Sequence, residues 1–148
     1  MNFSDEDTPL AKAAAAAVYV RRGLKGTFPA PAQPRVLTVA NQKGGVGKTT
    51  LTQAIATASA EYGKKTLAID ADPNATFTFL TGIENPRFTL REVMEKSVKI
   101  EDCATRTLDR YSLIPSASRL LFAEGKVPDF QSEEFDVVLI DSSSGPSS

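Results

Sequence analysis

Short apolar runs rich in β-branched residues recur along the chain and predict strands. They occupy Arg35–Ala40, Thr66–Ile69, Tyr111–Ile114 and Phe135–Ile140. Between the first two, Leu51, Ile55, Ala58 and Tyr62 are spaced by four, three and four positions, which predicts one face of an amphipathic helix. Strands that alternate with helices favour an α/β fold with a mostly parallel sheet flanked by helices.

The remaining helix signals are shorter. Gly63 is placed to cap the end of the predicted amphipathic helix. Further helices are predicted over Thr89–Lys96 and Ser116–Glu124, and the pattern does not settle Asp102–Asp109. We find no internal repeat.

The first 34 residues differ in character from the rest of the chain. Thr8 and Pro9 form a helix start, Gly23 forms a helix end, and the residues between them are rich in alanine. Residues 26–34 contain three prolines and no periodicity. We therefore predict a helical extension over 1–25, a proline-rich linker over 26–34 and one core domain over 35–148.

Length, charge and composition limit the kinds of protein to which this chain can belong. The 148 residues suit a single domain, and the net charge of −1 gives no general attraction to nucleic acid or to an anionic membrane. Cys103 is the single cysteine and there is no histidine, so the sequence allows no internal disulfide. The longest apolar stretch, Ala13–Val20, is too short to span a bilayer. We expect a cytoplasmic protein without membrane attachment.

A glycine-rich loop follows the first predicted strand. Gly44, Gly45 and Gly47 remove side chains where backbone N–H groups would approach a polyphosphate, and the following helix adds the positive end of its dipole. Lys48 places an ammonium on the phosphates and Thr49 a hydroxyl on Mg²⁺. The full predicted phosphate-binding set is Lys43, Gly44, Gly45, Val46, Gly47, Lys48, Thr49 and Thr50. The alternative is a glycine-rich turn with solvated lysines.

Three aspartates follow predicted strands and complete the candidate site. Asp70 and Asp72 are two apart, so their carboxylates face the same side of an extended chain. One carboxylate would position an attacking water and the other would organise the magnesium shell. Asp141 ends the apolar run Val137–Ile140, the form of a strand whose carboxylate contacts Mg²⁺ directly or through water. Ser142–Gly145 would then sense the γ-phosphate.

Each aspartate has an alternative interpretation. The first pair could belong to an ordinary Asp-Pro-Asn turn, and Asp141 could simply cap a buried strand. The glycine-rich loop upstream favours the functional interpretation of both. For the basic cluster Arg21, Arg22 and Lys25, a solvated helix end is favoured over nucleic-acid contact.

The segment Asn41–Thr50, with Ile69–Pro73, Leu113–Ser116 and Phe135–Asp141, resembles the ParA/MinD family of deviant Walker A ATPases. The similarity is greatest to the branch that partitions chromosomes and plasmids. It implies ATP and Mg²⁺ as ligands, and Lys43 as a catalytic group that reaches the phosphates of the partner across an ATP-sandwiched homodimer. It further implies a partner protein of the ParB type, nonspecific DNA binding, and association with the bacterial nucleoid.

The resemblance also assigns a role to each acidic residue. Asp72 would orient the hydrolytic water, and Asp70 would support it and lie just beyond the direct ligands of Mg²⁺. Thr49 would bind Mg²⁺ directly and Asp141 through water. This chain departs from the family in that Pro73 leads straight into Asn74-Ala75, where members usually carry an intervening pair such as Gln-Gly.

Family members usually continue well beyond the position of Asp141, so the resemblance implies that 35–148 is part of a P-loop ATPase domain whose C-terminal half is missing. In their fold the additional strands pair beside the strand that precedes the loop, so we expect Val36–Ala40 to present an exposed apolar sheet edge here. Two further functions stay open, a MinD-like cell-division regulator and a nucleotide-binding module without turnover. An iron–sulfur ATPase of the nitrogenase reductase type is excluded, because a single cysteine cannot supply a four-thiolate set.

Overall fold

The computed structural model describes residues 9, 12–13, 29–116, 130 and 134–143. Its centre is a five-stranded sheet in the order β1-β5-β2-β4-β3. The strands are β1 (Arg35–Val39), β2 (Thr66–Ala71), β3 (Thr105–Arg106), β4 (Ser112–Ile114) and β5 (Val137–Ser142). The first, second, fourth and fifth strands run parallel, and β3 pairs antiparallel with β4. The predicted α/β class with a mostly parallel sheet is confirmed.

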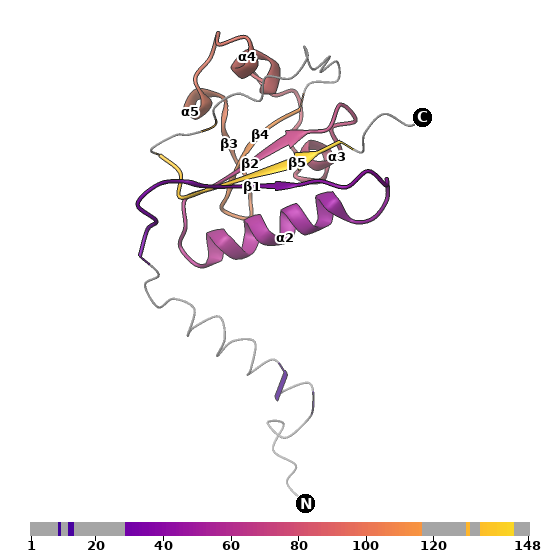
Figure 1. Ribbon diagram of the computed structural model, residues 1–148, viewed down its shortest axis with the longest axis vertical. Helices are drawn as coiled ribbons and strands as arrows, with labels where there is room; N and C mark the ends of the chain where they lie inside the picture. Colours follow the sequence, from indigo (N-terminus) through magenta and orange to yellow (C-terminus); the bar gives the residue numbers. More distant parts are fainter. Residues whose placement is uncertain (1–8, 10–11, 14–28, 117–129, 131–133, 144–148) are drawn as a thin grey trace, which may run out of the picture.

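Helices cover both faces of this sheet (Figure 1). The helix α2 (Lys48–Glu61) lies on one face, and α4 (Leu90–Met94) and α5 (Ile100–Cys103) lie on the other. The short α3 (Thr76–Leu80) follows the end of β2. Because both faces are covered, the central strand β2 is buried at all six of its positions.

Alternation along β2 divides the core into two clusters. Leu67, Ile69 and Ala71 belong to the cluster shared with α4 and α5. Ala68 belongs to the opposite cluster, with Ala56 of α2. The sheet is therefore a packed middle layer, and its strand ends are left to build a site.

The predicted amphipathic helix is confirmed as α2, but its apolar stripe is not its buried face. Leu51 is 53% exposed and Ile55 is 36% exposed, whereas Thr52 and Ala56 are fully buried. Small side chains at 52 and 56 let the helix lie close against the sheet, and the Thr52 hydroxyl donates to Asp141 Oδ1 on β5 at 3.2 Å. The buried face of α2 therefore carries small side chains and not the apolar stripe.

Several predicted elements change in extent. Asp70 and Asp141 lie within β2 and β5, not after them, and β5 begins at Val137. The predicted Thr89–Lys96 helix is present as α4, while α3, α5 and β3 were not predicted. Ser116 is not helical, and the rest of the helix predicted to Glu124 lies outside the described residues.

The N-terminal region is described at few positions. Residues 9, 12 and 13 have helical backbone, and residues 29–34 contain neither helix nor strand. The other residues of the predicted extension, including Arg21, Arg22 and Lys25, lie outside the described residues. The domain boundaries stay a prediction. Among the helices that the structure describes, none is both long and apolar enough to cross a membrane.

The strand β1 lies at the edge of the sheet. Within the described residues it pairs with β5 alone, and Val36 and Leu37 are 46% and 49% exposed. Leu51 and Ile55 add exposed apolar side chains on α2, which packs beside this strand. The expected apolar sheet edge is confirmed. An exposed edge of this kind is a template for pairing with another chain.

We predict that Leu37→Lys reduces concentration-dependent self-association of this chain, because a lysine on an edge strand disfavours pairing. Static light scattering over a concentration series would measure the effect. Leu108→Lys is the matched control, since Leu108 is 99% exposed and lies outside β1. Equal self-association of Leu37→Lys and the unaltered chain would contradict the prediction.

Candidate functional site

The glycine-rich loop connects the carboxyl end of β1 to the first turn of α2. Gly45 and Gly47 adopt positive φ values of 70° and 90°, a conformation that costs other residues about 1–2 kcal/mol. Gly47 is the N-cap of α2, which runs for 14 residues and carries no acidic side chain in its first turn. The unpaired amides of that turn and the helix dipole therefore favour an anion beside the loop.

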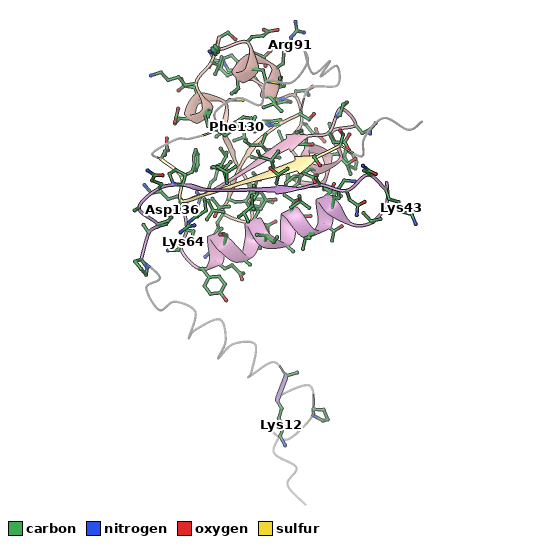
Figure 2. The ribbon with its side chains drawn as sticks, viewed as in Figure 1. Lys12, Lys43, Lys64, Arg91, Phe130 and Asp136 are labelled. Atoms are coloured by element: carbon green, nitrogen blue, oxygen red, sulfur yellow. The ribbon has the colours of Figure 1, made fainter. Side chains whose placement is uncertain are left out.

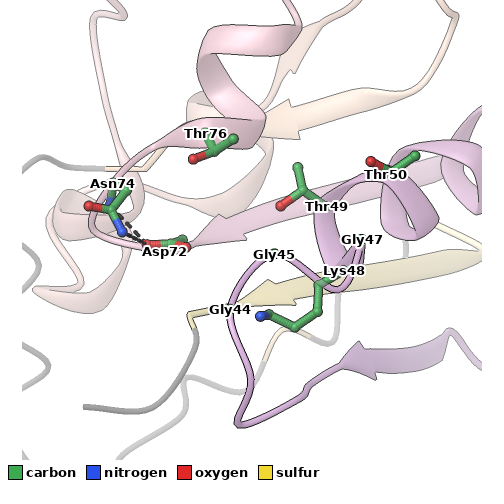
Figure 3. Close-up of a pocket in the computed structure, with 9 residues that line it drawn as sticks. All are labelled: Gly44, Gly45, Gly47, Lys48, Thr49, Thr50, Asp72, Asn74 and Thr76. Carbon is green, nitrogen blue, oxygen red and sulfur yellow. Dashed lines mark hydrogen bonds between the residues drawn. The ribbon is translucent and has the colours of Figure 1, made fainter. Parts of the chain in front are cut away.

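A cleft of about 460 Å³ opens between this loop and the segment that follows β2 (Figure 3). The residues that line it come from the loop, the start of α2, and the turn that leads into α3. They are Gly44, Gly45, Gly47, Lys48, Thr49, Thr50, Asp72, Asn74 and Thr76. The first seven were predicted as site residues. Asn74 and Thr76 were not, although Asn74 directly follows the Asp72-Pro73 pair that was recognised.

A hydrogen bond joins the first turn of α2 to the strand β5. Thr49 Oγ1 donates to Asp141 Oδ2 at 2.7 Å across a sequence separation of 92 residues. Asp141 is 1% exposed. Its burial raises the pKa of the carboxyl, and the charge of Asp72 adds to the rise, while hydrogen bonds from Thr49 and Thr52 and the charge of Lys48 oppose it. The carboxylate and the hydroxyl lie side by side.

Asp70 and Asp141 occupy paired positions in the adjacent strands β2 and β5. Asp70 is fully buried, and burial raises the pKa of its carboxyl. Its oxygens accept hydrogen bonds from Thr78 N at 2.8 Å, Thr78 Oγ1 at 2.7 Å and Asp72 N at 3.1 Å. The side chain is therefore behind the cleft and outside its lining, in contact with the backbone of Asp72.

Asp72 lies in the cleft itself. Its Oδ1 accepts hydrogen bonds from both Asn74 N and Asn74 Nδ2, each at 2.9 Å (Figure 3). The turn then continues through Ala75, which has a left-handed backbone with φ 52°. The carboxylate thus faces the space beside the phosphate loop, and its turn contains a strained residue.

Lys43 and Lys48 have different surroundings. Lys48 lines the cleft, and its Nζ donates to the carbonyl of Lys43 at 3.4 Å. Lys43 is exposed, lies at the outer end of the loop and does not line the cleft (Figure 2). Its backbone N–H donates to Asn41 Oδ1 at 2.9 Å. Val46 is 46% exposed and also lies outside the lining, so the structure does not bring these two predicted residues into the cleft.

The oxygens at the cleft fit a cation that is bound together with phosphate. The described residues contain no group of three or more His, Cys, Asp or Glu side chains that could hold a metal ion. The neighbouring oxygens are the Thr49 hydroxyl and the Asp141 carboxylate. A cation here would need further oxygen ligands from a bound molecule and from water, which is how Mg²⁺ binds with phosphates.

Fold and site together define a class of protein. A strand, a glycine loop and a helix carry the lysine and threonine of a phosphate site, and an aspartate comes from the neighbouring strand. These are the parts of a P-loop nucleotide-binding domain.

Comparison with known proteins identifies the family within this class. Residues 34–146 match the family model described as AAA domain. The chain is 42% identical over 89 residues to the chromosome partitioning protein ParA of Caulobacter vibrioides, covering 58% of this chain and 33% of ParA. The chain belongs to this AAA domain family, as a P-loop ATPase of the ParA/MinD type.

Solved structures show the same similarity. Cobyrinic acid a,c-diamide synthase from Mycobacterium smegmatis, with bound ADP and magnesium, matches with a TM-score of 0.65 and 33% identity over 73% of this chain and 50% of the synthase. The septum site-determining protein MinD from Pyrococcus horikoshii, complexed with Mg-ADP, matches with a TM-score of 0.60 and 26% identity over 76% of this chain and 50% of MinD. The chain therefore spans about a third to half the length of these relatives.

We predict that Gly47→Ala lowers the stability of the domain by about 1–2 kcal/mol and weakens binding of inorganic triphosphate, because alanine disfavours the left-handed φ of 90° at the start of α2. Gly63→Ala is the matched control, since Gly63 has a φ of 81° beyond the other end of α2. Denaturant unfolding would measure stability, and calorimetry would measure binding. Equal loss of triphosphate binding in both variants would contradict the prediction.

Proposed function

We propose that this chain binds Mg-ATP in the cleft between the phosphate loop and the turn after β2, and that it uses water to hydrolyse the bond between the β- and γ-phosphates. The observation that carries the proposal is the convergence of Lys48, Thr49 and Asp141 beside the start of α2. The relatives support the choice of ligand, because the M. smegmatis synthase was solved with ADP and magnesium and the P. horikoshii MinD with Mg-ADP.

The loop supplies the groups that bind the phosphates. Backbone N–H groups at the start of α2 donate hydrogen bonds to the phosphate oxygens, and the Lys48 ammonium offsets their charge. The glycines with positive φ keep side chains away from the phosphates. The Thr49 hydroxyl would hold a bound cation directly, and the Asp141 carboxylate would hold it through water. Magnesium, when bound, neutralises charge on the transferring phosphoryl group.

The turn after β2 supplies the group that orients water. Asp72 lines the same cleft as Lys48, so its carboxylate can accept a hydrogen bond from a water placed in line with the γ-phosphate. Asp70 lies behind it and holds the Asp72 backbone. In this assignment Asp72 contacts the reacting water, whereas Asp70 acts through Asp72.

The exposed position of Lys43 supports a homodimer that forms with ATP. A side chain at the outer end of the loop can meet the nucleotide of a facing copy, where an ammonium would offset charge that builds as the phosphoryl group leaves.

The cellular role we propose is chromosome or plasmid partitioning, in the bacterial cytoplasm at the nucleoid, with a ParB-like partner and nonspecific DNA. It is supported by similarity to the ParA of C. vibrioides.

We predict magnesium-dependent ATP hydrolysis by this chain that falls at least about a hundredfold in Lys48→Ala, the scale expected when a donor to developing charge is removed. Release of inorganic phosphate would measure it. Lys65→Ala is the matched control, because Lys65 is exposed and lies outside the cleft lining. Turnover that survives Lys48→Ala would contradict the assignment of the site.

We also predict that a slowly hydrolysed ATP analogue shifts the chain from monomer to dimer, and that Lys43→Ala abolishes the shift while Lys65→Ala retains it. The reason is that Lys43 would contact the phosphates bound by the other copy. Sedimentation velocity with and without the analogue would measure the shift. A dimer that forms equally well with Lys43→Ala would overturn the role of this lysine.

A further inference from the structure

The motif Leu113–Ser116 has no part in the site as described so far. It runs through the carboxyl end of β4 into the turn after it, and Ser116 is 5% exposed. The Ser116 hydroxyl donates to the Asp72 carbonyl at 2.6 Å, and the Ser116 N–H donates to Thr78 Oγ1 at 2.9 Å. One residue of this motif therefore contacts both the cleft turn and α3.

These contacts belong to a closed ring of hydrogen bonds through four residues. Thr78 Oγ1 donates to Asp70 Oδ2 at 2.7 Å, and Asp70 Oδ1 accepts from Asp72 N at 3.1 Å. Ser116 closes the ring between Asp72 and Thr78. The Thr78 hydroxyl is used twice, as donor to a carboxylate and as acceptor from an amide, so no apolar side chain can replace it.

The ring fixes the backbone of Asp72 from both sides. Its N–H is held by Asp70, and its carbonyl accepts from Ser116 Oγ and also from Ala75 N at 2.9 Å. Ala75 has a φ of 52°, and such a conformation persists in a non-glycine residue when its surroundings hold it. Without the ring, the turn that presents the Asp72 carboxylate would relax.

The ring is anchored to rigid parts of the fold. Asp70 lies in the fully buried strand β2. Pro115, next to Ser116, accepts a hydrogen bond through its carbonyl from Leu90 N of α4 at 2.8 Å. That helix begins with a capping box between Thr89 and Glu92. The position of Asp72 is thus tied to two strands and two helices of the domain.

We propose that Thr78 and Ser116 are positioning residues that hold Asp72 for the attack of water on the bound nucleotide. The proposal rests on the proposed hydrolysis. Neither side chain lines the cleft, so each acts through the Asp72 backbone and not on the nucleotide. Their loss should therefore slow the chemical step and leave nucleotide binding intact, because misplacement of a catalytic group by about 1 Å costs on the order of a hundredfold in rate.

The test uses Ser116→Ala and Thr78→Val in the full 148-residue chain. Thr78→Ser is the conservative variant, because it keeps the hydroxyl. Thr81→Val is the matched control: Thr81 follows α3 and its hydroxyl donates to Thr78 O at 2.8 Å, outside the ring. For each variant, kcat and KM for Mg-ATP are measured, together with hydrogen–deuterium exchange of a peptide spanning residues 70–80 without nucleotide.

We expect Ser116→Ala and Thr78→Val to lower kcat by roughly tenfold to a hundredfold with KM within about twofold of the unaltered chain. Exchange in the peptide should accelerate in both. Thr78→Ser and Thr81→Val should keep the kcat and the exchange of the unaltered chain. If Thr78→Val fails to fold, Ser116→Ala decides, since it keeps the N–H bond to Thr78.

Unchanged kcat in Ser116→Ala would overturn the proposal, and so would a rise in KM as large as the fall in kcat. An unaltered chain that binds no nucleotide or shows no turnover would contradict the proposed function instead. In that case the exchange data decide about the ring by themselves. The same exchange in Ser116→Ala and the unaltered chain would overturn it.

Discussion

The parallel pairing of β5 between β1 and β2 is the constraint on which the site depends. Its register sets Val39 beside Asp141 and Asp141 beside Asp70. The ends of three strands therefore meet at one edge of the sheet, where open α/β sheets bind ligands. The phosphate loop leaves one of these ends and the Asp72 turn leaves another. The bond from Thr49 to Asp141 then fixes the start of α2 against the same edge.

Two carboxyl groups at this edge are buried, and their charged forms need hydrogen bonds to offset the loss of contact with water. Asp70 and Asp141 lie in neighbouring strands, and burial raises the pKa of both carboxyls. Hydroxyl and amide donors from α2 and α3 oppose this rise by stabilising the charged forms. A carboxylate that is buried but fully hydrogen-bonded is held in one position, which favours precise placement of a cation and of a neighbouring catalytic group.

Much of this fold could be predicted from the sequence. Apolar runs identify buried parallel strands, and a glycine-rich loop of this kind indicates a strand before it and a helix after it. The errors have physical causes. The buried face of α2 was missed because it carries the small residues Thr52 and Ala56, whereas the search for periodicity follows the larger apolar side chains Leu51 and Ile55, which are exposed. The helix α3 is five residues long and begins after a left-handed Ala75, so it has no periodicity to detect. The structural role of Thr78 in this helix is recognisable only from its hydrogen bonds with Asp70 and Ser116.

Some of the site residues could likewise be predicted from the sequence, and others could not. Lys48, Thr49 and Asp72 are recognisable from spacing and are brought together in the cleft. Asn74 and Thr76 line it because the turn after β2 folds back, which spacing alone does not reveal. Lys43 was recognised by family resemblance, and its exposure gives it no role within a single copy of the described cleft.

The affinity of the cleft for ATP should depend on Mg²⁺. Isothermal titration calorimetry of ATP into the chain would be performed with excess Mg²⁺ and again with EDTA. We expect one ATP per chain with Mg²⁺, and affinity at least about tenfold weaker without it, because the Thr49 hydroxyl and the Asp141 carboxylate then face the phosphates without a cation between them. Absence of binding in both conditions, or equal affinity in both, would contradict it.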